Sequence, residues 1–113
     1  MCIRDSPNTW NIDVNKIEDA ITPNTCAIMP VNLLGNSCEY DRIIEICRKH
    51  NLMLIEDNCE SMGAKYGDKY TGSIGLAGSF SFFFSHHIQT MEGGMVLTDS
   101  KAVSYTHLRA HET

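Results

Sequence analysis

An apolar run, an amphipathic segment and a second apolar run follow one another in this chain, and that order constrains its fold more than any other feature. The first run, CAIMPV at residues 26–31, has the length of a strand. Residues 39–50 repeat apolar side chains at i, i+3, i+4 and i+7, which puts them on one face of a helix: Tyr40, Ile43, Ile44 and Cys47. The second run, LMLI at residues 52–55, is apolar without alternation, as is typical of a parallel strand covered on both faces. Together they predict a right-handed βαβ unit.

The flanking segments extend this pattern into an α/β fold. Residues 14–21 predict a short amphipathic helix, which Asp13 can cap and Pro23 ends. Residues 66–78 are dense in glycine and polar side chains and predict an irregular surface loop. Two further strands are expected after it, at residues 79–84 and 94–98. We therefore expect a mixed, mostly parallel sheet with flanking helices.

Charge and cysteine content narrow the class of protein. A formal net charge of −5 and a pI near 5.4 argue against nucleic acid or an anionic membrane as the main partner. No apolar run approaches the roughly 20 residues of a membrane span, and the first ten residues lack the layout of a secretory signal. The five cysteines form no Cys-x-x-Cys pair, which predicts reduced thiols in or near a core. We expect a cytoplasmic protein.

The two ends of the chain mirror each other at the level of DNA. MCIRDS, residues 1–6, can be encoded by a DNA whose reverse complement reads VSYTH, residues 103–107. This inverted element resembles a transposase adapter of sequencing libraries, and residues 108–113 resemble a translated primer tail. We expect residues 1–6 and 103–113 to be foreign, and residues 7–102 to be a fragment of a longer reading frame. Cys2, His107 and His111 are then not candidates for a site.

Two carboxylates, Glu56 and Asp57, come directly after the second apolar run, at its expected carboxyl end. Open α/β sheets bind their ligands at this end of their strands. A carboxylate there can bind a metal ion, act as a base or hold a cationic cofactor group, and it can equally cap the turn that follows. Position alone leaves these alternatives open.

Two adjacent histidines, His86 and His87, follow the strand expected at residues 79–84 and belong to the same edge of the sheet. Adjacent residues of an extended segment point to opposite faces, so the two imidazoles are not expected to face one ligand. A metal site could combine Asp57 with one histidine, although two ligands fall short of the usual three or four. We expect His87 to be structural.

Small residues surround this histidine pair. Ser81 and Ser85 flank the aromatic run, where a hydroxyl can hold a phosphate or bond to a local partner. Gly93 and Gly94 after Glu92 predict a tight turn with positive φ.

The segments LMLIEDNCESMGAKYGDKYTGSIG and GSFSFFFSHHIQTMEGGMVLTD resemble the central part of the DegT/StrS family of sugar aminotransferases. The resemblance runs over residues 11–99 and implies part of the large domain of the type I, aspartate aminotransferase-like fold of pyridoxal 5'-phosphate enzymes. In that family the aspartate of the Ile-Glu-Asp strand end binds the cofactor's pyridine nitrogen, which matches Asp57. The serine of the Phe-Ser-Phe strand contacts the phosphate, which matches Ser81. The position that contacts the ring region is Glu60, where the aminotransferases tend to have glutamine.

His86 departs from the aminotransferase pattern. Counting back from Glu92, the lysine that holds the cofactor covalently in the family falls on His86, and the nearest lysines, Lys69 and Lys101, lie outside the motif. The same replacement marks the 3-dehydratases of the family, which serve the colitose and ascarylose pathways. In them pyridoxamine 5'-phosphate is held noncovalently, and the first histidine removes a proton from the cofactor's C4′ carbon before the sugar 3-hydroxyl leaves.

The resemblance therefore implies a nucleotide-sugar 3-dehydratase of dideoxysugar and lipopolysaccharide biosynthesis, acting on a nucleotide-linked 4-keto-6-deoxy sugar. His86 would be its catalytic base, for which an unperturbed imidazole pKa near 6.5 is suitable. The resemblance also implies a homodimer for the complete protein. The alternatives are an aminotransferase relative that has lost its lysine, an interrupted reading frame that is inactive by itself, and a metal-dependent hydrolase using Asp57 and His86.

Overall fold

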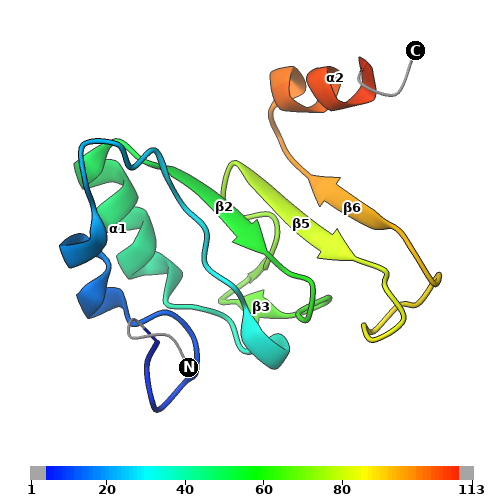
Figure 1. Cartoon of the computed structure of the whole chain (residues 1–113), viewed down its shortest axis with the longest axis horizontal. Helices are drawn as coiled ribbons and strands as arrows, with labels where there is room; N and C mark the ends of the chain where they lie inside the picture. The colour runs from blue at the N-terminus through cyan, green and yellow to red at the C-terminus, as the bar shows by residue number, and fades with distance from the viewer. Residues whose placement is uncertain (1–4, 110–113) are drawn as a thin grey trace.

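A four-stranded sheet forms the centre of the chain in the computed structural model, which describes residues 5–109 (Figure 1). Residues 1–4 and 110–113, which belong to the two ends expected to be foreign, lie outside the described residues. The strand order is β1-β2-β5-β6, and a separate hairpin pairs β3 with β4. The bounds of the strands and helices are β1 Ala27–Ile28, α1 Tyr40–His50, β2 Met53–Asp57, β3 Lys65–Tyr66, β4 Lys69–Tyr70, β5 Ala77–Ser81, β6 Gly94–Leu97 and α2 Lys101–Arg109.

The sheet is mixed and mostly parallel, as predicted. β1 pairs parallel with β2, β2 pairs parallel with β5, and β5 pairs antiparallel with β6. The predicted βαβ unit is β1, α1 and β2. The strand expected at residues 26–31 is shorter than predicted because Pro30 has no N–H to give to the ladder. Its carbonyl still accepts the Asp57 N–H at 3.0 Å, and pairing resumes as one bridge between Val31 and Asp57.

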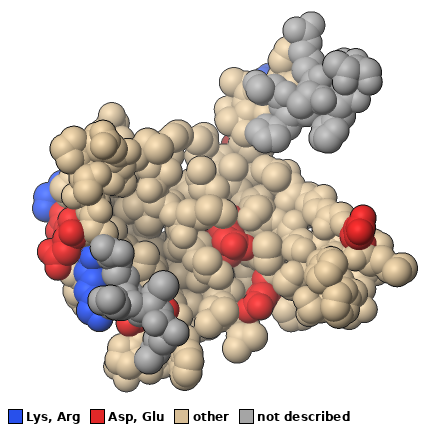
Figure 2. All heavy atoms as spheres, in the orientation of Figure 1, with Lys and Arg blue, Asp and Glu red and all other residues tan. Residues whose placement is uncertain are grey.

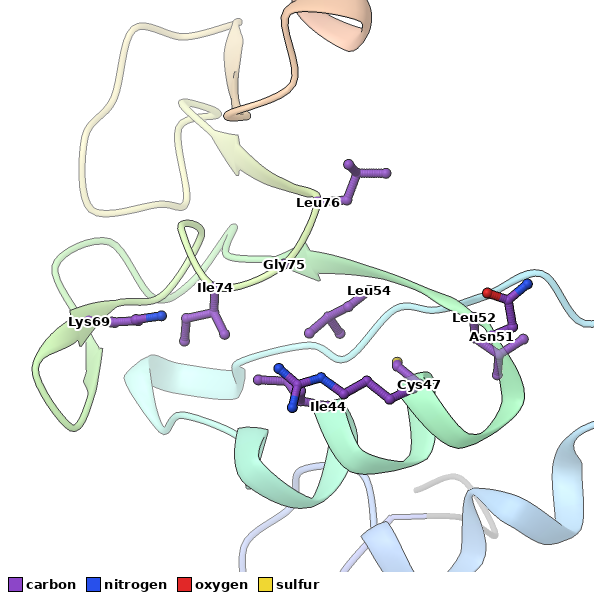
Figure 3. A pocket seen from close by; sticks show the side chains of 10 residues that line it. Ile44, Cys47, Asn51, Leu52, Leu54, Lys69, Ile74, Gly75 and Leu76 are labelled. Atoms are coloured by element: carbon purple, nitrogen blue, oxygen red, sulfur yellow. The ribbon is translucent and has the colours of Figure 1, made fainter.

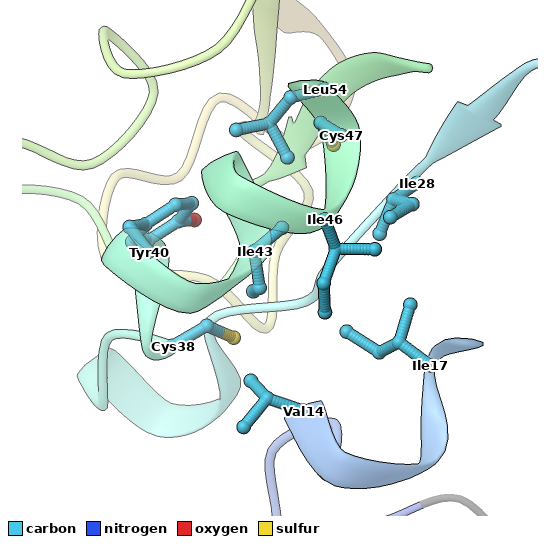
Figure 4. Close-up of a cluster of buried hydrophobic side chains, with 9 residues drawn as sticks. All are labelled: Val14, Ile17, Ile28, Cys38, Tyr40, Ile43, Ile46, Cys47 and Leu54. Atoms are coloured by element: carbon cyan, nitrogen blue, oxygen red, sulfur yellow. The ribbon is translucent and has the colours of Figure 1, made fainter. Parts of the chain in front are cut away.

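Helix α1 packs one face into the core that Figure 4 shows. The helix ends at Asn51, which takes a left-handed conformation with φ of 54° and donates its N–H to the last turn. Its buried face carries Tyr40, Ile43, Ile46 and Cys47. The sequence pattern placed Ile44 on this face in place of Ile46. Ile44 is half-buried, because the core also includes Val14 and Ile17 of the N-terminal turns, on the side that Ile46 faces.

The helix expected at residues 14–21 is not an α-helix. The segment forms two 3-10 turns, η1 at Val14–Lys16 and η2 at Glu18–Ala20, closed by i to i+3 hydrogen bonds such as Ala20 N–H to the Ile17 carbonyl at 2.9 Å. So short a segment gains too few i to i+4 bonds to offset the cost of starting an α-helix. The predicted cap is confirmed, because the Asp13 side chain accepts the Asn15 N–H.

Two further predictions need correction. Part of the loop expected at residues 66–78 pairs as the β3–β4 hairpin. Strand β2 is not covered on both faces: its burial alternates, and Met53 is 45% exposed. Helix α1 lies on one side of the strand, and the described residues leave the other side open. The sheet therefore has one face that packs into the core and one face that does not.

Charged side chains gather at the end of the molecule that carries α1 and the N-terminal turns, while the strands show isolated acidic groups in this view (Figure 2). At that end Glu18 accepts bonds from Lys49 at 2.6 Å and His50 at 2.7 Å. The Lys49 bond, and then the His50 bond, lower the pKa of Glu18 to about 2. In the described part of the chain no helix is long and apolar enough to cross a membrane.

We expect Ile43→Ala to lower the free energy of unfolding by about 3 kcal/mol, because the side chain is fully buried in the core and its loss leaves a cavity. Ile44→Ala, one position along the same helix and half-buried, should cost only about 1 kcal/mol. Urea unfolding of the purified chain measures both values. Equal losses at the two positions would contradict the orientation of α1.

Candidate functional site

The open face of the sheet carries two of the predicted site residues at its carboxyl edge. Asp57, the last residue of β2, pairs in register with Ser79 of β5, and Ser81 lies two residues further along β5. Since side chains alternate between faces along a strand, these three residues share one side of the sheet. The alternate positions Leu54 and Phe80 are buried on the other side. The sheet therefore presents a carboxylate and two hydroxyls together on its open face.

Asp57 is half-buried. Its Oδ1 accepts the Cys59 N–H at 3.1 Å, and its carboxylate also bonds to the Cys59 thiol. Burial, and next the bond to the Asp57 carboxylate, raise the pKa of the Cys59 thiol to about 11. A half-buried carboxylate at the edge of the open face is suited to a cationic or N–H partner.

Ser81 ends β5, where its Oγ accepts the Phe83 N–H at 3.3 Å. The hydroxyl hydrogen remains available to an acceptor. The neighbouring loop is closed at its base by Phe82, which donates its N–H to the Gly93 carbonyl and accepts the Thr90 N–H, both at 2.9 Å. Gly93 has a φ of 127°, which confirms the predicted positive-φ turn.

The other two predicted site residues, Glu60 and His86, meet in a hollow of about 280 Å³, here called the histidine hollow. It is lined by Leu34, Glu60, Ser85, His86 and His87. The Glu60 Oε2 accepts the Leu34 N–H at 3.3 Å, which ties the residue to the turn after β1. Asp57 and Ser81 are not among the lining residues.

Both histidines line this hollow, although the prediction placed them on opposite faces of an extended segment. The expectation assumed an extended backbone, but the chain turns after β5, and His86 donates its N–H to the Phe83 carbonyl at 3.0 Å. In a turn, successive side chains need not alternate between two faces. Among residues 5–109 no group of three histidine, cysteine, aspartate or glutamate side chains could hold a metal ion.

The role of Glu56 was not predicted. Its side chain is fully buried, and its carboxylate accepts the backbone N–H groups of Gly72, Ile74 and Gly75. Gly75 approaches β2 so closely that a Cβ atom there would lie 2.5 Å from the Leu54 carbonyl oxygen. Gly72 and Gly75, which lie 16 and 19 residues after Glu56, were the available signal, but spacing alone does not show which loop amides meet which carboxylate.

A buried amide network next to Asp57 was also missed. Asn32 donates to the Tyr40 hydroxyl at 2.6 Å and to the Asn58 Oδ1 at 2.9 Å, and its own Oδ1 accepts the Cys38 N–H. Burial raises the pKa of Tyr40, which keeps its hydroxyl neutral. The network joins the turn after β1, the start of α1 and the residue that follows Asp57, so it fixes the frame of the site.

Comparison with known proteins finds a family and several relatives that are similar to this chain. The sequence profile of the DegT/DnrJ/EryC1/StrS aminotransferase family matches residues 3–111. The chain is similar to GDP-4-keto-6-deoxy-D-mannose 3-dehydratase of Escherichia coli O55:H7, with 49% identity over 106 residues that make up 92% of this chain and 27% of that protein. It is also similar to GDP-perosamine synthase of Caulobacter vibrioides, with 48% identity over 97 residues, 86% of this chain and 26% of that protein.

Solved structures agree. A structure of the E. coli GDP-4-keto-6-deoxy-D-mannose-3-dehydratase with bound hydrated PLP is similar with a TM-score of 0.82 and 48% identity, over 89% of this chain and 26% of that one. Helicobacter pylori PseC, an aminotransferase, is similar with a TM-score of 0.88 and 32% identity, over 97% of this chain and 30% of that one. The predicted fold, part of an aminotransferase-type α/β domain, is confirmed. The chain spans about a quarter of the length of these relatives.

We expect Glu56→Gln to lower the free energy of unfolding by about 2 to 4 kcal/mol, because an amide cannot accept all three backbone N–H groups and turns a donor toward them. Glu60→Gln should cost less than about 1 kcal/mol, since Glu60 is only half-buried and accepts one N–H. Urea unfolding compares the two variants. Similar losses would show that Glu56 is not the anchor of the loop.

The pKa of Cys59 predicts its reactivity. Only the thiolate reacts with iodoacetamide, so a pKa raised from 9.0 to about 11 should keep the alkylation rate rising about tenfold between pH 9 and pH 10. Peptide mass spectrometry measures the rate, with the exposed Cys26 as the accessible reference. Asp57→Asn should speed the reaction, since it removes a nearby negative charge. A rate that levels off near pH 9 would contradict the burial of Cys59 and its bond to Asp57.

Proposed function

Because the chain belongs to the DegT/DnrJ/EryC1/StrS aminotransferase family, we propose that its complete protein is a nucleotide-sugar 3-dehydratase. Its cofactor would be pyridoxal or pyridoxamine 5'-phosphate, and its substrate a nucleotide-linked 4-keto-6-deoxy sugar of dideoxysugar biosynthesis. The observation that carries the proposal is His86, an imidazole in a hollow to which no lysine of the chain contributes.

All the lysines of the chain lie within the described residues and away from the histidine hollow. Lys16 pairs with Asp13, Lys49 pairs with Glu18, Lys65 lies over the Tyr70 ring, Lys69 lies on β4 and Lys101 begins α2. A lysine amine is the group that bonds covalently to a carbonyl cofactor. The arrangement therefore favours a cofactor held without a covalent bond to residues 5–109.

The open face of the sheet fits this cofactor. Asp57 would hold the proton on the ring nitrogen with its carboxylate, and Ser81 would donate its hydroxyl hydrogen to the phosphate. Glu60 would contact the ring region from the side of the histidine hollow. When bound, the cofactor supplies a protonated ring that withdraws electrons from the reacting carbon.

His86 is the base in this proposal. A neutral imidazole nitrogen can accept a proton near pH 7 and return it, and it forms no lasting bond with a carbonyl group. The Phe83 carbonyl holds the backbone of His86 in the turn, and Glu60 lies in the same hollow. His87 borders the hollow as well, so its expected structural role stays a prediction.

A second candidate is a sugar aminotransferase of the same family. It is favoured by the similarity to GDP-perosamine synthase, whose 48% identity is close to the 49% shared with the dehydratase. We further propose a homodimer and a cytoplasmic location for the complete protein. The 113-residue chain by itself, with both faces of its sheet incompletely covered, would be inactive.

Borohydride trapping tests the proposal. The gene is first recovered without the inverted DNA element that we propose flanks it at residues 1–6 and 103–113. Its product is incubated with pyridoxal 5'-phosphate, reduced and weighed by mass spectrometry. We expect no covalent adduct with the unaltered protein and a stable adduct with His86→Lys, which places an amine in the histidine hollow. An adduct on a lysine of the unaltered protein would favour the aminotransferase.

Activity provides the control. His86→Asn should lower kcat of dehydration by about 10²- to 10⁴-fold, the usual contribution of a general base. His87→Asn, the adjacent position in the same hollow, should change kcat much less. GDP-4-keto-6-deoxymannose, the substrate in the name of the E. coli relative, is the first substrate to assay. A loss at His87 as large as that at His86 would reject the assignment of the base.

A further inference from the structure

A groove of about 410 Å³ runs between α1 and the loop that leads into β5, and Figure 3 shows its lining. It shares no lining residue with the histidine hollow. Its walls are partly polar and partly apolar. The apolar side chains come from α1, the turn after it, β2 and the loop before β5: Ile44, Cys47, Leu52, Leu54, Ile74 and Leu76. Leu54 and Cys47 belong to the packed core, so the bottom of the groove is the core itself.

Two cations border this groove without a counter-ion. Arg48 of α1 and Lys69 of β4 both line it, and Figure 3 shows Lys69 extending toward Ile74. Within residues 5–109 neither side chain makes an ion pair, and no carboxylate lines the groove.

The nearby acids are already engaged. Glu45 pairs with Arg42 at 3.0 Å, and Asp41 accepts the Tyr66 hydroxyl at 3.1 Å. A groove that combines apolar side chains with two unpaired cations is complementary to a segment that carries both apolar side chains and a negative charge.

The apolar surface continues beyond the groove. Leu76 lies 39% exposed at the entry to β5, and Met95 and Leu97 of β6 lie 38% and 40% exposed. Met95 pairs in register with the buried Phe80, and Leu97 pairs with Gly78, so both lie on the face of the sheet that α1 covers. Helix α1 packs against β1 and β2, and the loop before β5 covers Gly78 and Phe80 through Gly72, so this face is uncovered over β6. A surface of this extent suits a packed polypeptide segment better than a small anion.

We propose that the groove holds a segment of the remaining polypeptide, which places apolar side chains against Ile44, Leu54 and Leu76 and a carboxylate against Arg48 and Lys69. Two observations favour this occupant of the groove. The charges are complementary to an acidic partner, and about three quarters of the length of the relatives lies outside this chain. The proposal rests on the part of the proposed function that assigns the chain to a longer protein, and it does not depend on the dehydratase chemistry.

Zero-length cross-linking of the complete protein with a carbodiimide tests the contact. We expect Lys69 to be linked to an aspartate or glutamate that lies outside these 113 residues in the same polypeptide. Lys49 and Glu18, 2.6 Å apart, supply an internal positive control. Mixing ¹⁴N- and ¹⁵N-labelled protein separates links within one subunit from links between two. A link to a second copy, a link to an acid of this chain, or an unlinked Lys69 beside a formed Lys49–Glu18 link would overturn the proposal.

Charge reversal gives an independent measurement. Arg48→Glu combined with Lys69→Glu should lower the Tm of the complete protein by about 2 to 4 °C, and the shift should shrink in high salt. Lys65→Glu, in β3 of the same hairpin and outside the groove, is the matched control for Lys69→Glu alone. The same shift for these two single variants would overturn the proposal. Borohydride trapping at His86 does not depend on either result, so failure of the groove and failure of the dehydratase assignment are distinguishable.

Discussion

The buried carboxylate of Glu56 is the interaction on which the rest of the site depends. A charge without solvent contact is costly unless hydrogen bonds satisfy it, and here the N–H groups of Gly72, Ile74 and Gly75 do so. The bonds hold the loop before β5 against β2, which lets β5 enter beside β2 in parallel register. Because neighbouring strand residues point to opposite faces, an inward Glu56 requires an outward Asp57. The structural carboxylate thereby orients the one that we propose binds the cofactor.

The turn after β1 adds the second half of the site. Pro30 interrupts the β1 ladder, and Asn32 then leaves the strand and enters the amide network with Tyr40 and Asn58. Two residues later Leu34 takes a φ of 52° and gives its N–H to Glu60. Three segments therefore meet at the histidine hollow. The turn after β1 and the segment after β2 lie at one edge of the sheet because β1 and β2 are parallel, and the turn after β5 is the third.

The sequence predicted what periodicity and order determine, and missed what depends on contacts distant in the sequence. The βαβ unit, the mixed sheet and the Gly93 turn follow from local patterns, and the structure confirms them. The shared hollow of His86 and His87 was missed because a hydrogen bond to Phe83 turns a backbone that the pattern read as extended. Ile46 replaced Ile44 in the core because Val14 and Ile17, some thirty residues earlier, belong to the same cluster. The partners of Glu56 were not predictable because three loop amides had to converge on it.

The two faces of the sheet have different chemistry, and each has exposed apolar surface that the remaining polypeptide could cover. On one face α1 covers β1 and β2, and the apolar surface of Leu76, Met95 and Leu97 extends past it beside two unpaired cations. On the other face Met29, Val31, Met53 and Val96 are exposed around the polar edge that holds Asp57 and Ser81. Exposed apolar surface of this kind marks contact with other polypeptide. Segments of the same protein that cover the open face would exclude water from Asp57. Without water the attraction between its carboxylate and a bound cation is stronger, so the proton on that cation is held more firmly.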